Sequence, residues 1–248
     1  MTEHITSNRH TSPVILRNTH VARLPQMSNT APRWTAGPLT RAALTIAADL
    51  FASKARKASD TPYLSHLLAV SALVMEHGGS EVQAAAGLLH DVIEDTPHDA
   101  AALTDHLLAA GVNHADAQQV ADIVKASSDG KFGEPRDKST WRERKEEYLN
   151  RLRAKDSGDP TLLVSLADKV HNSEATLVLI RGGTTATEFY VEPPFNAKAP
   201  DQKWYYTSLS QIFRERLGGI AQALPLVLRL KSAVDEIFVG VEAEAPSL

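Results

Sequence analysis

Cysteine is absent from this 248-residue chain. Its absence excludes a disulfide scaffold and every metal site that depends on thiolate ligands, and it fits an intracellular enzyme. No apolar run approaches the roughly 18 residues that are needed to span a bilayer. The N-terminus also lacks the apolar stretch of a secretory signal. We therefore expect a cytoplasmic protein with no membrane partner.

Positive charge is scarce as well, because the formal net charge is −4 at pH 7. This balance argues against non-specific nucleic-acid binding as the main activity. Hydrophobic residues make up 43% of the chain and charged residues 23%, which is ordinary for a globular protein. The sequence thus favours a globular protein that acts on a small molecule.

The hydrophobic pattern divides the chain into a leader and a helical region. Residues 1–35 are rich in polar residues and proline and show no period, which predicts a disordered leader. From Pro38 onward, apolar residues recur at helical spacing and no alternating strand pattern appears. We expect helices near 39–57, 63–76, 81–91, 100–110, 113–127, 141–155, 160–179, 201–217 and 220–238. The prediction is an all-α fold, with one domain over 36–240 and a flexible tail over 241–248.

The most informative motif is His90-Asp91, which is followed by the carboxylates Glu94 and Asp95. On a continuous helix, His90 and Glu94 would share one ridge, and Asp91 and Asp95 the next. Carboxylates this close repel one another and raise each other's pKa. A bound divalent cation would remove most of this repulsion, so the motif indicates a metal site.

Two further residues from other predicted helices can complete this site. His66 interrupts an apolar helix start, and Asp168 ends an apolar run. Taken singly, His66 fits a hydrogen-bonded core histidine and Asp168 fits a cap or an ion-pair partner. Together with His90 and Asp91 they form a ligand set of imidazole and carboxylate, which suits Mn, Fe or Zn better than Ca.

Three segments resemble, in the same order, the HD superfamily of metal-dependent phosphohydrolases. They are TPYLSH at 61–66, GLLHDVIEDT at 87–96 and LADKVHN at 166–172. Because the Glu94-Asp95 pair is present, the resemblance is strongest to the hydrolase domain of RelA/SpoT homologues. It runs from about 40 to 180, with a weaker echo at 203–206. The resemblance implies a helical HD-domain bundle with the metal site between helices, in a stand-alone small alarmone hydrolase.

By this resemblance, the reaction is removal of the 3′-pyrophosphate of guanosine tetra- or pentaphosphate, (p)ppGpp, which yields GDP or GTP and pyrophosphate. The implied Mn²⁺ ligands are His66, His90, Asp91 and Asp168. Glu94 and Asp95 correspond to the catalytic carboxylates that position and deprotonate the attacking water. Arg56, Lys57 and Asn172 correspond to nucleotide-contacting residues.

The residues themselves suggest further substrate contacts. Arg144 and Lys145, on a highly charged predicted helix, and Lys131, in the loop before it, are candidates to bind phosphate. Trp204 and Tyr205 are candidates to stack on a purine. The competing interpretations are a solvated helix face for the cations and core packing for the aromatic residues.

The chain departs from the family pattern at several positions. Leu67 replaces a common proline, and Glu174 and Ala175 replace an arginine and a threonine. We expect Glu174 to face the nucleotide and to disfavour a phosphate there. The segment 181–200 is longer than the corresponding connection in stand-alone members and predicts an irregular surface stretch. These departures place the guanine specificity in question.

Several alternative functions remain open at this point. The substrate can be (p)ppApp, or the 2′- or 3′-phosphate of a dinucleotide such as NADPH. The protein can also be an antitoxin that opposes a partner alarmone synthetase, although the intact Glu94-Asp95 pair argues against a non-catalytic binding module. A phosphodiesterase of cyclic nucleotides or a dNTP hydrolase is less expected, because such enzymes usually lack this pair.

Overall fold

Helices form all of the regular secondary structure in the residues that the computed structural model describes, which are 1, 31–57, 59–129, 139–191 and 193–242. In chain order they are α1 (Pro38–Leu50), α2 (Leu64–Glu76), α3 (Glu81–Leu89), α4 (Val92–Asp95), α5 (Ala100–Ala109), α6 (His114–Ser127), α7 (Trp141–Ala154), α8 (Pro160–Arg181), α9 (Ala186–Phe189), α10 (Ala199–Leu217) and α11 (Leu224–Ile237). The predicted all-α fold class is therefore confirmed.

The boundaries of several helices follow from local sequence chemistry. Ser80 begins α3 with a capping box, in which its hydroxyl accepts from the Gln83 amide and the Gln83 side chain accepts from the Ser80 amide. Asp99 caps α5 in the simpler way, through one side-chain oxygen. Gly78 follows α2 and Gly111 follows α5, with φ of 90° and 82°. Glycine adopts this left-handed conformation without the steric cost of a Cβ atom.

The first predicted helix is too long, because α1 ends at Leu50 rather than near residue 57. The chain then makes a short loop in which the Arg56 amide donates to the Thr61 carbonyl at 2.9 Å and the Tyr63 amide donates to the Lys54 carbonyl at 2.8 Å. These bonds satisfy backbone groups that a longer helix would have paired internally. As a result, the basic residues of this stretch lie on a loop and not on a helix.

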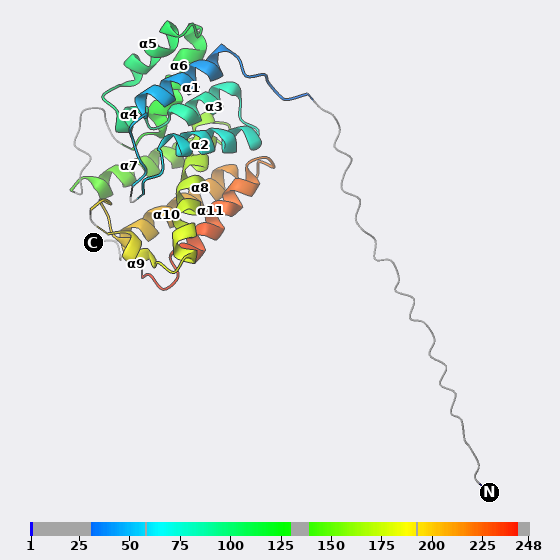
Figure 1. The fold of residues 1–248 in the computed structure, drawn as a ribbon, viewed down its shortest axis with the longest axis vertical. Coiled ribbons are helices and arrows are strands. Elements are labelled where there is room, and N and C mark those ends of the chain that lie inside the picture. The colour runs from blue at the N-terminus through cyan, green and yellow to red at the C-terminus, as the bar shows by residue number, and fades with distance from the viewer. Residues whose placement is uncertain (2–30, 58, 130–138, 192, 243–248) are drawn as a thin grey trace. The chain divides into compact units, whose positions relative to one another are not determined.

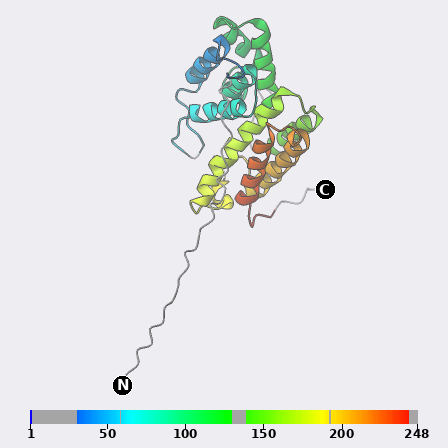
Figure 2. The same cartoon turned by 90° about the vertical axis from the view of Figure 1, so that its right-hand side faces the viewer.

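The long helix α8 lies at the centre of the bundle. It packs against α2, α3, α6, α10 and α11, and Figures 1 and 2 show it running between the N-terminal helices and the last two helices. Its apolar side chains, such as Leu162, Leu166 and Val170, are fully buried. Burial of one such side chain contributes about 1.5–3 kcal/mol. This packing fixes the position of every polar side chain that α8 carries.

Helices α2 and α3 approach each other closely at Gly87. A Cβ atom on Gly87 would lie 3.2 Å from the Cα atom of Ser71 on α2. The Ser71 hydroxyl donates to the Ala84 carbonyl of α3 at 2.8 Å and links the two helices further. A side chain at this position would therefore force the two helices apart by a few tenths of an ångström. This spacing bears on the distance between the two histidines described below.

Most of the predicted leader and tail lies outside the described residues, so both stay predictions. Residues from Trp34 onward form one unit. The indole of Trp34 donates to the Gly79 carbonyl at 3.0 Å, and this bond anchors the chain before α1. Among the described helices, none is both long and apolar enough to cross a membrane.

Candidate metal centre and substrate cavity

Four side chains from three parts of the bundle converge at one point. His66 Nε2, from α2, lies 3.3 Å from Asp168 Oδ1 of α8 and 3.5 Å from Asp91 Oδ2. His90 Nε2, directly after α3, lies 3.0 Å from Asp91 Oδ2 and 3.5 Å from Asp168 Oδ1. All four residues are buried. The structure thus brings together the four residues that the sequence predicts as metal ligands.

The chemistry of this cluster fits a divalent cation. His90 Nδ1 lies 2.9 Å from the Gly87 carbonyl and donates its hydrogen there, so that Nε2 presents a lone pair to the cluster. This buried Nε2 lies 3.0 Å from Asp91 Oδ2 but makes no well-aligned hydrogen bond. A buried polar atom without a partner costs free energy, and a metal ion removes that cost.

The electrostatics of the cluster also favour a cation. Burial lowers the pKa of His90, but the carboxylates of Asp91 and Asp168 outweigh this effect and place the pKa well above its ordinary value. The cluster therefore attracts positive charge. Imidazole nitrogens together with carboxylate oxygens form a donor set that suits divalent transition metals.

Two ligand partners were missed by the sequence reasoning. The Tyr63 hydroxyl donates to Asp91 Oδ2 at 2.6 Å, and His66 Nδ1 lies 2.8 Å from His171 Nδ1. Burial, His66 and Arg56 lower the pKa of His171 to about 4, so its ring is neutral. With His66 Nε2 directed at the cluster as a metal ligand, His66 Nδ1 carries the hydrogen and His171 Nδ1 accepts it. Such outer contacts fix the orientation of a metal ligand. The sequence signal that could have identified these two residues is helical spacing. His171 lies three residues after Asp168, and Tyr63 lies three residues before His66.

The predicted grouping of three carboxylates around His90 is wrong. The helix is interrupted at His90 and Asp91, so α3 and α4 are separate and the expected ridges do not form. Of the three carboxylates of this motif, Asp91 is the one that contacts the histidines. Glu94 Oε1 instead accepts from the Asp129 amide at 2.8 Å, and Asp95 Oδ2 lies 2.6 Å from the Lys54 ammonium.

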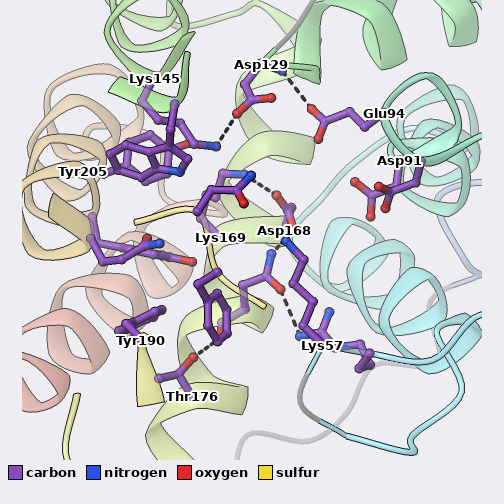
Figure 3. Close-up of a pocket in the computed structure, with 18 of the residues that line it drawn as sticks. Lys57, Asp91, Glu94, Asp129, Lys145, Asp168, Lys169, Thr176, Tyr190 and Tyr205 are labelled. Atoms are coloured by element: carbon purple, nitrogen blue, oxygen red, sulfur yellow. Dashed lines mark hydrogen bonds and ion pairs between the residues drawn. The ribbon is translucent and has the colours of Figure 1, made fainter. Parts of the chain in front are cut away.

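Both Glu94 and Asp95 nevertheless line the cavity that opens beside the cluster of histidine and aspartate side chains. The cavity has a volume of about 390 Å³, which is within the usual range for a small-molecule site. Figure 3 shows Glu94 and Asp91 at one end of it, with Asp168 and Lys169 between them and Tyr190. The basic side chains that line it are Lys54, Arg56, Lys57, Arg144, Lys145 and Lys169.

Several of these cations are held by the acidic residues of the site. Asn172 donates to Asp168 Oδ1 at 2.5 Å and accepts from Arg56 Nη2 at 3.0 Å, so it connects a metal ligand to a cation. The Lys169 ammonium lies 2.6 Å from Asp168 Oδ2. Lys169 was not predicted, although it directly follows a ligand in the sequence.

The cations on α7 are organised by one buried carboxylate. Arg144 donates to Asp129 Oδ2 at 3.0 Å, and the Lys145 ammonium contacts the same oxygen. Because the Asp129 amide also bonds Glu94, this residue joins the charged helix to the catalytic candidate. Lys131, the third predicted phosphate contact of this region, lies outside the described residues.

The structure separates the two aromatic candidates. Tyr205 lines the cavity, and the Lys145 ammonium lies 4.6 Å from the centre of its ring. Trp204 is not among the residues that line the cavity. The guanidinium carbon of Arg142 lies 3.4 Å from the centre of the Trp204 ring instead.

The expectation that Glu174 faces the nucleotide is wrong. Both of its carboxylate oxygens bind Arg229 of α11, at 2.8 Å and 2.7 Å. Glu174 is not among the residues that line the cavity. The physical reason is the packing of α8 against α11, which offers the carboxylate a guanidinium on the side away from the cavity.

The fold and the site together define an all-helical protein with a buried centre of histidine and aspartate beside a polar cavity. The sequence model of the HD domain family matches residues 43–178. The chain therefore belongs to the HD domain family, and this family implies a divalent metal ion at the centre.

A relative from Synechocystis, named as a probable guanosine-3′,5′-bis(diphosphate) 3′-pyrophosphohydrolase, is 33% identical over 130 residues. The match covers 52% of this chain but only 16% of that relative, so this chain spans a small part of the relative's length. The family match confirms the predicted resemblance to the HD superfamily. The predicted enzyme class, a metal-dependent phosphohydrolase, agrees with this family and with the name of the relative.

Two solved structures share the fold. The 1.85 Å crystal structure of lmo0812 from Listeria monocytogenes EGD-e has a TM-score of 0.56 and 23% identity, with coverage of 73% of this chain and 99% of that one. A structure described as "A metazoan ortholog of SpoT hydrolyzes ppGpp and plays a role in starvation responses" has a TM-score of 0.55 and 21% identity. That match covers 83% of this chain and 96% of the other.

Proposed function

We propose that this protein hydrolyses the 3′-pyrophosphate of (p)ppGpp with the help of a bound Mn²⁺ ion and releases pyrophosphate and GDP or GTP. The observation that carries the proposal is that one cavity lies beside the buried cluster of histidine and aspartate and is also lined by a group of basic side chains. The name of the Synechocystis relative supports this substrate.

The residues that would hold the metal are His66, His90, Asp91 and Asp168. When bound, the ion supplies Lewis acidity toward a phosphoryl oxygen. Tyr63, His171 and Asn172 orient three of these ligands by hydrogen bonds. Because Mn²⁺ stands below Zn²⁺ in the affinity order and is the weaker Lewis acid, help from a neighbouring base is expected.

Glu94 is placed to be that base. Its carboxylate lies on the cavity wall, and the Asp129 amide holds one of its oxygens at 2.8 Å. In this role Glu94 accepts the proton of the attacking water, and Asp95, held by Lys54, orients the same water. General-base assistance is typically worth about 10²–10⁴ in rate.

The basic side chains of the cavity bind the phosphates. Arg56 and Lys57 approach from the loop after α1, and Arg144 and Lys145 approach from α7. Lys54 and Lys169 line the same cavity and complete the proposed set. Hydrogen bonds between a guanidinium and a phosphate are shorter and stronger than neutral ones, so the two arginines carry much of the phosphate affinity.

The test is an Mn²⁺-dependent product assay with ppGpp, ppApp and NADPH side by side, with Glu94→Gln as the inactive control. We expect pyrophosphate from ppGpp. Pyrophosphate from ppApp alone would keep the reaction class and change the base. Phosphate from NADPH alone, or no product from any of the three, would refute the proposal. The cytoplasmic location and a partner alarmone synthetase stay predictions.

A further inference from the structure

The end of the cavity away from the metal centre is lined by aromatic rings. Phe189, Tyr190 and Phe195, here called the aromatic wall, all belong to the segment between α8 and α10. The ring centres of Phe189 and Phe195 are 4.9 Å apart, and those of Tyr190 and Phe195 are 5.2 Å apart. Figure 3 shows Tyr190 and Thr176 at this end, away from Asp91 and Glu94.

The aromatic wall is held in place from behind. Tyr190 is buried and stacks on Phe238, with ring centres 5.8 Å apart and an angle of 12° between the ring planes. A side-chain hydrogen bond joins Tyr190 to Thr176 of α8. Thr185 and Glu188 form a capping box that begins the short helix α9. These contacts hold the rings in the arrangement described.

Polar uncharged side chains also line the cavity. Thr176 lies beside Tyr190, Asn196 directly follows Phe195, and Asn172 and Gln202 are further lining residues. Lys57 lies at the boundary, with its ammonium 5.9 Å from the centre of the Phe195 ring. Flat apolar rings with amides and a hydroxyl around them match the faces and the edges of a nucleobase. A phosphate, by contrast, finds its cations nearer the metal centre.

We propose that the aromatic wall receives the purine base of the substrate, with the half-buried rings of Phe195 and Phe189 as the contact surface. This inference rests on the proposed function and adds the residues that select the substrate. An amide offers both a donor and an acceptor. The aromatic wall therefore favours a purine over a smaller pyrimidine and does not by itself distinguish guanine from adenine.

The experiment measures the binding of GDP, ADP, CDP and pyrophosphate to the Mn²⁺-loaded protein by calorimetry. Phe195→Ala is expected to weaken GDP and ADP binding by about tenfold, as for loss of one base–aromatic stack, and to leave pyrophosphate binding unchanged. Phe195→Tyr should retain nucleotide affinity. With ppGpp as substrate, KM should rise in Phe195→Ala while kcat stays nearly constant.

The matched control is Phe213→Leu, because Phe213 is a buried phenylalanine that is not among the residues that line the cavity and makes none of the ring contacts of the aromatic wall. It should lower Tm and leave nucleotide affinity unchanged. If Phe195→Ala does not fold, Phe189→Ala and Phe195→Leu carry the same test. Unchanged GDP affinity in the folded variants would overturn the proposal. An equal loss of pyrophosphate affinity would also overturn it, because the ring would then act through Lys57.

These outcomes separate the two proposals. If the wild-type protein binds purine diphosphates through Phe195 but releases no pyrophosphate from ppGpp, the base site stands and the proposed function fails. If it releases pyrophosphate while every variant of the aromatic wall keeps the wild-type KM, the function stands and the base site fails. Equal affinity of the wild-type protein for GDP, CDP and pyrophosphate would also reject the base site.

Discussion

The two ends of the cavity are built in different ways. At the metal end, side chains from α2, α8 and the turn after α3 hold one another by hydrogen bonds and close charge contacts. At the other end, one irregular segment supplies rings that pack on one another and on Phe238. The contacts of the metal end depend on the positions of single polar atoms. Those of the aromatic end depend on the area of contact between rings.

This difference predicts how each end responds to change. Removing one atom from the metal end leaves a buried charge or a lone pair without its partner, which is costly. Removing one ring from the aromatic wall reduces a contact surface by a part of its area. We therefore expect substitutions at the metal end to act on catalysis and stability, and those at the aromatic end to act on affinity.

The largest effect should come from Asp168→Asn. Asp168 contacts both histidines and pairs with the Lys169 ammonium. The variant should lose bound metal and all pyrophosphate release. Its free energy of unfolding should fall by about 3–5 kcal/mol, because Lys169 keeps a buried charge without a partner. Metal analysis and urea denaturation check this, with the exposed Asp156→Asn as control. Full metal content in Asp168→Asn would contradict the ligand assignment.

Glu94→Gln should separate metal binding from turnover. Because Glu94 contacts the Asp129 amide rather than the histidines, the variant should keep its metal. Without a general base, kcat should fall by about 10²–10⁴. Metal content and steady-state rates on the same preparation give the answer. Loss of metal from this variant would show that Glu94 is a ligand instead.

A smaller effect is expected when a partner of a ligand is removed. His171→Leu deletes the acceptor of the His66 Nδ1 hydrogen, so the ring of His66 loses its fixed orientation. Metal affinity should fall by about 10–100-fold, and kcat at saturating metal should change little. Titration with a competing chelator measures this, with the exposed His106→Leu as control. An unchanged metal affinity would limit His171 to packing.

The smallest effect should come from Trp204→Leu. Because Trp204 lies under the Arg142 guanidinium and is not a cavity residue, KM for the nucleotide should not change. Stability should fall by about 0.5–2 kcal/mol with the loss of the cation–π contact. A raised KM with unchanged stability would return Trp204 to the base site and weaken the contrast between the two ends.

The convergence of His66, His90 and Asp168 could be predicted from the sequence for a physical reason. Each lies in or directly after an apolar run, and a polar residue buried with such a run needs a partner. The starts of the helices near residues 81 and 100 could be predicted, because each cap depends on a few neighbouring residues. What failed depended on distant contacts: Arg229 draws Glu174 away from the cavity, and the pairing of residues 54–63 shortens α1. The residues of the aromatic wall show no helical or strand period in the sequence, so no pattern indicated that they lie together.

Gly87 has a consequence that reaches beyond the packing of two helices. Its carbonyl fixes the His90 ring, while the absence of a side chain lets α2 bring the His66 ring to within 5.0 Å of the His90 ring, centre to centre. The coordination geometry therefore depends on a residue that touches no metal. In Gly87→Ala, the added methyl group would lie between α2 and α3 and would increase the distance between the two histidines. The preference for one metal ion over another would then change, although the predicted ligands, the proposed base and the basic side chains are the same residues as before.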